Sequence, residues 1–378
     1  MAKQDVRVET RFLVGAEPFT QWMADVLISR GFGPDEASEA GNWAAQTASY
    51  EVETHGARKL LHLLDDEFAR SGSCVPQASH DVLLSFPSLE VWDGRKKLGP
   101  AIARMAQARS VEMATSQGMG IVFVRECNHF GWGPAYALEL LTDELLIGNA
   151  CQGAIPIVTP IGGTDARVGS NAIAIALNTG TEECPVFVWD TGTAAMSWGE
   201  VQKLRLEGGA LRPGSAVDAQ GKPAAQAEDA VSLLPAGTIG NALGILIELL
   251  SANVGAGDPR FRSEPAGDYP AGEPSTCVFI FFALNLAVFD ALDFPNGRSR
   301  KENLAGMVDA IFKDNGQSRI VGLRKWQAKQ RSDHYGGLLF SPESIAAFRA
   351  EASTQGIVFP EDCKEIEVSI EQIAVAGK

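Results

Sequence analysis

Basic residues are scarce in this sequence. Its 378 residues include 32 Lys plus Arg against 47 Asp plus Glu, which gives a formal net charge of -15 at pH 7. A field of this sign repels phosphate backbones and anionic lipid. We therefore expect no nucleic-acid partner and no membrane partner, and any site for a small anion must be built from a few local cations.

The sequence also contains no C-x-x-C motif, no signal-peptide pattern and no apolar run of membrane-spanning length. The six cysteines include no C-x-x-C pair, so neither a zinc knuckle nor a thioredoxin-like site is indicated, and we expect no metal. The N-terminal residues mix charges and lack the apolar core of a signal peptide. The longest apolar run, residues 278–289, is shorter than the ~20 residues that cross a bilayer and predicts a buried strand. These features predict a cytoplasmic protein with free thiols.

The common phosphate-binding motifs are absent as well. No G-x-x-x-x-G-K-[ST] occurs, and Gly118 and Gly120 precede a predicted strand, whereas the glycines of a Rossmann turn precede a helix. With 45% hydrophobic residues, the chain nevertheless has ample material for a folded core.

Hydrophobic spacing divides the chain into three stretches. Residues 1–118 are mainly helical, residues 119–299 are rich in β-branched runs between Gly and Pro turns, and residues 300–378 return to helical spacing. We predict an α/β fold with a mixed central sheet and flanking helices, in which the first stretch packs with the third and the second forms a sheet-rich part. The predicted strands are 82–86, 120–124, 145–151, 155–158, 173–177 and 185–189. The predicted helices are two within 17–49, then 56–70, 100–117, 134–141, 241–251, 299–312 and 342–350.

Two further expectations concern burial. Helix 241–251 is hydrophobic on nearly every face, which predicts that it is buried. Residues 213–229 and 255–274 are rich in Gly, Pro and polar residues, which predicts exposed irregular loops.

The five histidines can be weighed one by one. His62, His80 and His334 have no functional pattern beside them and are interpreted as surface or capping residues. His55 lies in the sequence THG at a loop-to-helix junction, and His129 lies in NHFG between a strand and a helix, where ligands tend to bind. An acid/base pair and a purely structural role in shaping the loops both fit these residues.

Two loops are rich in small residues and hydroxyls. One runs from residue 162 to 171 and the other from residue 190 to 193, each beside β-like segments. Backbone N–H groups and hydroxyls in such loops can hold phosphate or ribose, while plain tight turns have the same composition. Both interpretations remain open at this point.

These motifs occur in a fixed order along the chain. From the N-terminus they are THG at 54–56, Asp93-Gly94, Gly118 and Gly120, NHFG at 128–131, Pro160 with Gly162 and Gly163, Gly169-Ser170-Asn171, and Asp190 with Thr193, Trp198 and Gly199. The succession resembles the type 2 malate/L-lactate dehydrogenase family, which includes ureidoglycolate and sulfolactate dehydrogenases, diketogulonate reductase and piperideine-2-carboxylate reductase.

The resemblance implies an oxidoreductase that uses NAD or NADP and has a non-Rossmann dinucleotide-binding fold, usually as a homodimer, with residues 119–299 as the cofactor-binding part. It implies hydride transfer between nicotinamide and a small 2-hydroxy or 2-oxo acid or a cyclic 2-imino acid. His55, His129 and Asp190 would be catalytic, with His55 exchanging the proton, and Thr54 would contact the substrate. The implied cofactor-binding residues are Asn128, Gly169, Ser170, Asn171, Asp190, Thr191, Gly192, Thr193 and Gly240.

One departure from the family pattern concerns the substrate. Where the family reads His-Gly-x-x-Arg, this chain has Lys59, with Arg58 one position earlier. Lys lacks the bidentate fork of Arg, so either Lys59 binds the substrate carboxylate as a point charge or Arg58 reaches it from another side of the helix.

A second departure concerns the cofactor. A serine, a lysine and a glutamate of the family pattern are replaced by Ala194, Ile239 and Leu323. Each lost charged hydrogen bond weakens binding by ~1.5 to 3 kcal/mol. Either Arg319, Arg324 or Lys325 supplies new contacts, or the chain keeps the fold without hydride transfer, as a non-redox enzyme or binding subunit for a small carboxylate.

Overall fold

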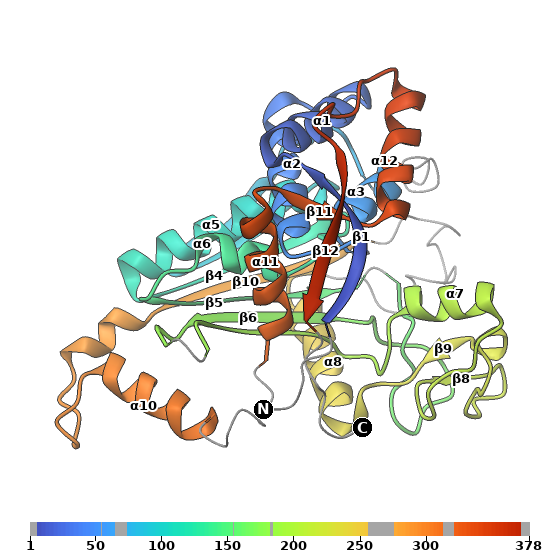
Figure 1. Ribbon diagram of the computed structural model, residues 1–378. Helices are drawn as coiled ribbons and strands as arrows, with labels where there is room; N and C mark the ends of the chain where they lie inside the picture. The colour runs from blue at the N-terminus through green and yellow to red at the C-terminus, as the bar shows by residue number, and fades with distance from the viewer. Residues whose placement is uncertain are drawn as a thin grey trace.

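A seven-stranded mixed sheet forms the centre of the molecule. The computed structural model describes residues 6–53, 55–64, 74–153, 155–181, 184–255, 276–312 and 321–371 (Figure 1). The strand order is β2-β3-β4-β10-β5-β6-β7, and only β3 and β4 are parallel neighbours. The strands are β2 Asp81–Phe86, β3 Leu89–Asp93, β4 Met119–Cys127, β5 Leu145–Gln152, β6 Ala172–Asn178, β7 Val186–Gly192 and β10 Cys277–Asn285. A Rossmann sheet is mostly parallel, so the predicted mixed, non-Rossmann α/β fold is confirmed.

The predicted apolar strand lies in the middle of this sheet. Strand β10 pairs with β4 on one side and β5 on the other, and residues 286–291 continue as the 3-10 helix η2 (Leu286–Ala291). Successive side chains of a strand point to opposite faces. Phe279 and Phe281 therefore enter the main core, while Ile280 packs with Ile247 on the other face.

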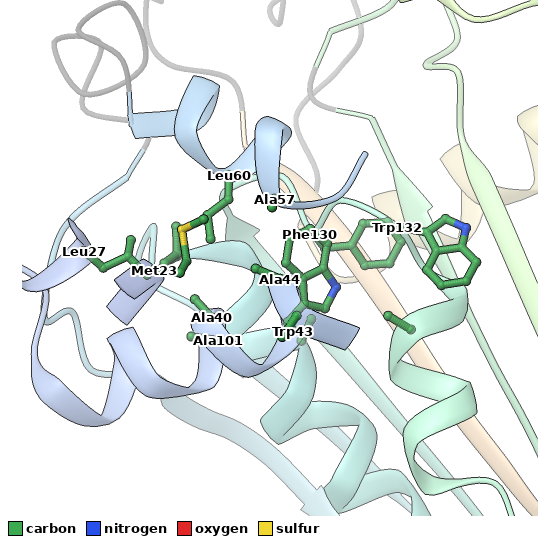
Figure 2. Packing of buried hydrophobic residues seen from close by; sticks show 14 of the residues in the cluster. Met23, Leu27, Ala40, Trp43, Ala44, Ala57, Leu60, Ala101, Phe130 and Trp132 are labelled. Carbon is green, nitrogen blue, oxygen red and sulfur yellow. The ribbon is translucent and has the colours of Figure 1, made fainter. Parts of the chain in front are cut away.

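Helices cover both faces of the sheet (Figure 1). On the first face lie α1 Ala16–Ser29, α2 Pro34–Ser49, α3 Ala57–Leu64, α5 Gly99–Gln117 and α6 Pro134–Leu140, and on the second lies α8 Gly237–Ala252. The main core lies between the first group and the sheet, where Trp43 of α2 packs close to Phe130 in the loop after β4 (Figure 2). The N-terminal helices thus lie directly against the loop that carries His129.

A second, three-stranded sheet joins the two ends of the chain. Its order is β11-β1-β12, with β1 Val6–Val14, β11 Leu338–Phe340 and β12 Lys364–Glu371. These strands were not predicted: β1 carries charged residues at alternate positions, and its pairing partners lie more than 320 residues away in the sequence. The pairing brings both terminal stretches together. The proposed division at residues 118 and 299 stays a prediction.

The remaining elements complete the C-terminal part and a small lobe. They are α7 Trp198–Glu207, β8 Ala216–Val217, η1 Ala227–Asp229, β9 Ser232–Leu233, α10 Arg300–Phe312, α11 Leu323–Tyr335 and α12 Pro342–Gln355. None of the helices in the described ranges is long and apolar enough to span a membrane.

Two local expectations were wrong, and two others fall almost wholly outside the described ranges. Residues 213–229 are not a plain exposed loop, because Ala216, Ala224 and Ala227 are buried in a second hydrophobic cluster against α7. Residues 155–158 form only an isolated bridge, at Val158, and no strand. The expected loop at 255–274 and the last turns of the helix expected to end near residue 70 fall almost wholly on residues that the structure does not describe.

Helix α8 differs most from its expected environment. It forms as predicted, but only Gly240, Gly244, Ile247 and Ser251 are buried. Its other side exposes Ile239, Leu246, Leu249 and Leu250, which we call the apolar face of α8; Leu249 is 60% exposed. Small residues let the helix lie close to the sheet on one side only, so the sequence predicted the helix correctly and its burial wrongly.

Candidate active site

A pocket of about 380 Å³ lies where the loops after β4 and β5 meet the start of β6 and the end of β7. This volume is within the range of small-molecule sites, roughly 300 to 1,000 Å³. All three residues predicted as catalytic line it. The residues that line the pocket include His55, His129, Trp132, Cys151, Ser170, Asn171, Asp190, Thr191, Gly192, Ala194 and Ser197.

The two histidines come from distant parts of the chain. Their ring centroids are 6.3 Å apart, although one precedes α3 and the other follows β4. Gly131 makes this approach possible: its φ is +70°, and a Cβ there would collide with the Trp43 ring and lie 2.9 Å from the His55 carbonyl oxygen. A residue with a side chain would push the two loops apart.

The His129 ring has a defined hydrogen-bonding state. Its Nδ1 accepts a hydrogen bond from the Gly131 N–H at 2.8 Å, so a neutral ring carries its proton on Nε2. Burial, then the positive charge of Lys59 and the neighbouring His55, hold the pKa of His129 well below its usual range. The ring is therefore neutral at neutral pH and presents Nε2–H as a donor.

His55 has a similar electrostatic environment. The side chain is exposed at the pocket, yet protein surrounds most of the ring. This partial burial, followed by the charge of Lys59, lowers its pKa below 6.5. We expect a neutral imidazole at neutral pH, which can accept a proton from a substrate hydroxyl.

Lys59 and Arg58 have different charged and titratable neighbours. The charge of Lys59 acts on both histidines, and burial lowers its own pKa. Arg58 is exposed, and its charge acts on Glu343 of α12. The structure thus brings Lys59 to the histidine pair and places Arg58 near α12. Thr54, the third predicted substrate contact, lies outside the described residues.

Asp190 lies near the end of β7, on the opposite wall of the pocket. Its Oδ2 accepts a hydrogen bond from Trp132 Nε1 at 2.7 Å. The side chain is exposed to the pocket, although protein surrounds most of the carboxyl group. This burial raises the pKa of Asp190 above its usual value, and the Trp132 hydrogen bond and the charge of Lys325 offset part of the rise. The resemblance implies a catalytic role for Asp190, and the side chain that hydrogen-bonds to it here is Trp132.

Some of the residues predicted to bind the cofactor line the pocket, and others lie behind these and support them. Ser170, Asn171, Thr191 and Gly192 line the pocket together with Asp190. Thr193 is buried behind them, where its backbone N–H donates to the carbonyl oxygens of Ser170 and Asn171. A Cβ on Gly240 would lie 2.5 Å from the Thr193 carbonyl oxygen, so Gly240 lets α8 approach this support. Asn128 is buried beside His129, and residues 162–164 are exposed away from the pocket.

Glu248 of α8 is a supporting residue that the sequence interpretation missed. Its Oε1 accepts from the Gly169 N–H at 2.8 Å and from Asn171 Nδ2 at 3.1 Å. Asn171 Oδ1 in turn accepts from the Gly153 N–H at 2.9 Å. A carboxylate within an otherwise apolar helix was the available signal, since such a group needs hydrogen-bonding partners. Glu248 fixes the loop that precedes β6.

The three residues that differ from the family pattern in the cofactor region differ in their exposure. Ala194 lines the pocket, Ile239 is 75% exposed in the first turn of α8, and Leu323 is half-buried at the start of α11. Of the proposed replacements, Lys325 lies next to the pocket wall, with Nζ 5.7 Å from the centre of the Trp132 ring. Arg324 is exposed, and Arg319 lies outside the described residues.

The thiols of Cys127 and Cys151 are protonated at neutral pH. Cys127, Cys151 and Cys277 are buried at neighbouring strand ends, and burial raises the pKa of Cys127 and Cys151 well above the usual range. A protonated thiol is a poor nucleophile and metal ligand. Among the residues that the structure describes, no group of three or more His, Cys, Asp or Glu side chains could hold a metal ion.

Comparison with known proteins identifies relatives of this chain. The family model described as malate/L-lactate dehydrogenase matches residues 14–345. Malate dehydrogenase of Pyrococcus abyssi is 28% identical over 258 residues, 65% of this chain and 68% of that protein. For 2,3-diketo-L-gulonate reductase of Escherichia coli the values are 26% over 196 residues, so the match spans 57% of that enzyme and 52% of this chain.

Solved structures show the same fold. Malate dehydrogenase of Pyrococcus horikoshii OT3 superposes with a TM-score of 0.73 at 19% identity, covering 92% of this chain and 97% of that one. Sulfolactate dehydrogenase of Methanocaldococcus jannaschii gives 0.73 at 23% identity, with 92% and 98% covered. Delta1-piperideine-2-carboxylate reductase of Pseudomonas syringae gives 0.73 at 21% identity, with 90% and 99% covered.

Proposed function

Because the chain belongs to the malate/L-lactate dehydrogenase family, it is an oxidoreductase, and we propose that it transfers a hydride between NAD(P) and the C2 atom of a small carboxylate. The substrate class is a 2-hydroxy or 2-oxo acid or a cyclic 2-imino acid. The observation that carries this proposal is the pocket itself, which combines two neutral histidines with a nearby lysine on one side and a carboxylate on the other.

The donor set of the pocket fits the nicotinamide end of the cofactor. Ser170, Thr191 and Ser197 contribute polar groups to the wall, and the carboxylate of Asp190 can accept hydrogen bonds from sugar hydroxyls or a carboxamide. When bound, the cofactor supplies or accepts the hydride. Ser170, Asp190, Thr191 and Gly192 would hold it, with Gly169, Thr193 and Gly240 supporting them from behind.

The two histidines on the opposite wall handle the substrate together with Lys59, which does not line the pocket but lies close enough for its charge to act on both rings. Lys59 supplies the positive charge for the substrate carboxylate, and His55 exchanges the proton with the substrate oxygen or imine nitrogen. With a 2-oxo substrate, His129, with its proton on Nε2, donates a hydrogen bond to the same oxygen and so polarises the carbonyl group. Because their low pKa values keep both rings neutral, Lys59 is the group that provides the positive charge for the substrate carboxylate at this end of the pocket.

Cofactor binding is the first test of this proposal. We expect NADH or NADPH at 100 times its Kd to stabilise the protein by ~2.7 kcal/mol, seen as a rise in Tm. Ser170→Trp, which fills the wall, should abolish the rise, whereas Ser116→Trp at the exposed end of α5 should leave it. Absence of any shift with both nucleotides, and of any change at 340 nm with a panel of 2-oxo acids and cyclic imines, would sink the proposal.

We also propose that the protein is a homodimer that works in the cytoplasm. The apolar face of α8 supports the first point, because exposed leucines on one helix are typical of a subunit interface. Leu249→Glu is expected to shift the protein from dimer to monomer in light scattering after size exclusion. Leu206→Glu, on α7 and 92% exposed, is the matched control and should leave the mass unchanged. A monomeric parent protein would contradict this.

A further inference from the structure

Lys325 lies behind the pocket wall in the first turn of α11. Its Nζ lies 5.7 Å from the centre of the Trp132 ring and donates to the Tyr50 carbonyl oxygen at 3.5 Å. The ammonium is largely enclosed by protein, which lowers its pKa through burial. An enclosed ammonium needs partners that compensate for lost hydration.

Trp132 connects this cation to the pocket. Its ring has Lys325 over one face, and its Nε1–H donates to Asp190 Oδ2 at 2.7 Å. A cation over the ring draws electron density from the indole and makes the N–H a stronger donor. Ammonium, indole and carboxylate thus form one chain of contacts that ends on the pocket wall.

Helix α11 holds Lys325 in this position from both ends. At its start, Gly322 has φ +87°, and a Cβ there would lie 2.8 to 3.0 Å from atoms of Val188, two residues before Asp190. Farther along, Arg331 pairs with both carboxylate oxygens of Glu51 at 2.9 and 3.0 Å. The helix therefore bridges β7, which carries Asp190, and the segment that leads to His55.

We propose that Lys325 is a positioning residue of the active site, which acts through Trp132 to hold the Asp190 carboxylate in place and ionised against the pocket. This inference rests on the proposed function. With Oδ2 fixed on Trp132, the second oxygen of Asp190 remains for a donor of the bound ligand. The Lys325 ammonium lies over the Trp132 ring and donates to the Tyr50 carbonyl oxygen, so we infer that it acts on the ligand through Trp132 and Asp190.

The surrounding charges fix the sign of the expected pH effect. Lys325 faces Asp190 of β7, Glu51 and Glu53 after α2, and Arg331 of α11, while Asp190 faces Lys325. The charge of Lys325 lowers the pKa of Asp190. Its removal therefore raises that pKa, and a step that needs ionised Asp190 is lost at a higher pH than in the parent protein.

The kinetic test compares Lys325→Met with Lys325→Arg in the full chain. Lys325→Met should lower kcat/KM by roughly 10- to 100-fold and move the acidic limb of its pH profile upward, and Lys325→Arg should recover most of the loss. Lys329→Met, one turn along α11 where Lys329 pairs with Asp333, is the control and should change neither. A Lys325→Met profile that matches the parent protein would overturn the inference.

A second measurement does not depend on turnover. Lys325→Met and Asp190→Asn are combined in a double-mutant cycle read as Tm, and coupled residues should give losses that do not add. Additive losses would overturn the inference even in an active enzyme. Conversely, coupling in a protein that turns over no substrate would refute the proposed function and leave the positioning contact established. If Lys325→Met does not fold, Lys325→Gln takes its place in the same cycle with Asp190→Asn.

Discussion

His55→Ala is expected to lower kcat by about 10²- to 10⁴-fold, the usual contribution of a general acid or base. The pocket places this imidazole 6.3 Å from His129, ring centre to ring centre, and near the charge of Lys59. Stopped-flow or steady-state absorbance at 340 nm measures the loss. Binding of NADH or NADPH should remain, because the residues that we propose to hold the nucleotide lie on the other wall.

The pH dependence gives a second readout for His55. In the oxidation direction the imidazole must be neutral to take the proton, so kcat/KM falls as the pH falls through its pKa. Burial and the charge of Lys59 place that pKa below 6.5, so the acidic limb lies below pH 6.5. His334→Ala, exposed on α11, is the control. If His55→Ala kept turnover within a few-fold of the control, the proton would have to be exchanged elsewhere.

The sequence predicted six of the seven strands of the central sheet, because most of them are β-branched runs separated by turns, and it missed β3. Strand β10 is the clearest case, since a run from residue 278 onward that is apolar on both faces can be buried on both faces. Strand β1 was missed although its charges alternate with apolar residues. Its pairing with β12 depends on residues at the far end of the chain, which local spacing does not reveal.

The site was predicted as separate motifs and not as a geometry. The two histidine motifs were recognised, but their contact depends on Gly131 packing against Trp43, a long-range fit that no motif spacing encodes. For the same reason the sequence named Lys325 only as one of three cations, and the position of its ammonium over Trp132 became visible only in the fold.

Helix α8 shows the opposite limit. Its sequence is apolar on nearly all sides, and burial was the natural expectation for such a helix. The single chain buries one side, through glycines and Ile247, and uses Glu248 to hold the pocket loop. The apolar residues on the other side of α8 are exposed in a single chain. In our proposed dimer, the subunit interface would bury them.

Lys59→Met is expected to raise KM for the carboxylate substrate and to lower kcat/KM by roughly 10- to 100-fold, since a charged hydrogen bond contributes about 1.5 to 3 kcal/mol. The same change should move the acidic limb of the oxidation profile to higher pH. The positive charge of Lys59 lowers the pKa of both His55 and His129, and its loss therefore raises both values.

Arg58 makes this prediction selective, because the two cations are neighbours in sequence and only one acts on the histidines. Arg58→Met should leave KM and the acidic limb unchanged, since its charge acts on Glu343. Lys59→Arg keeps the charge and should keep the limb in place, even if a larger head group alters KM. Should Arg58→Met raise KM while Lys59→Met does not, the carboxylate would bind on the α12 side of the helix, and the cation in an otherwise acidic chain would have to be reassigned.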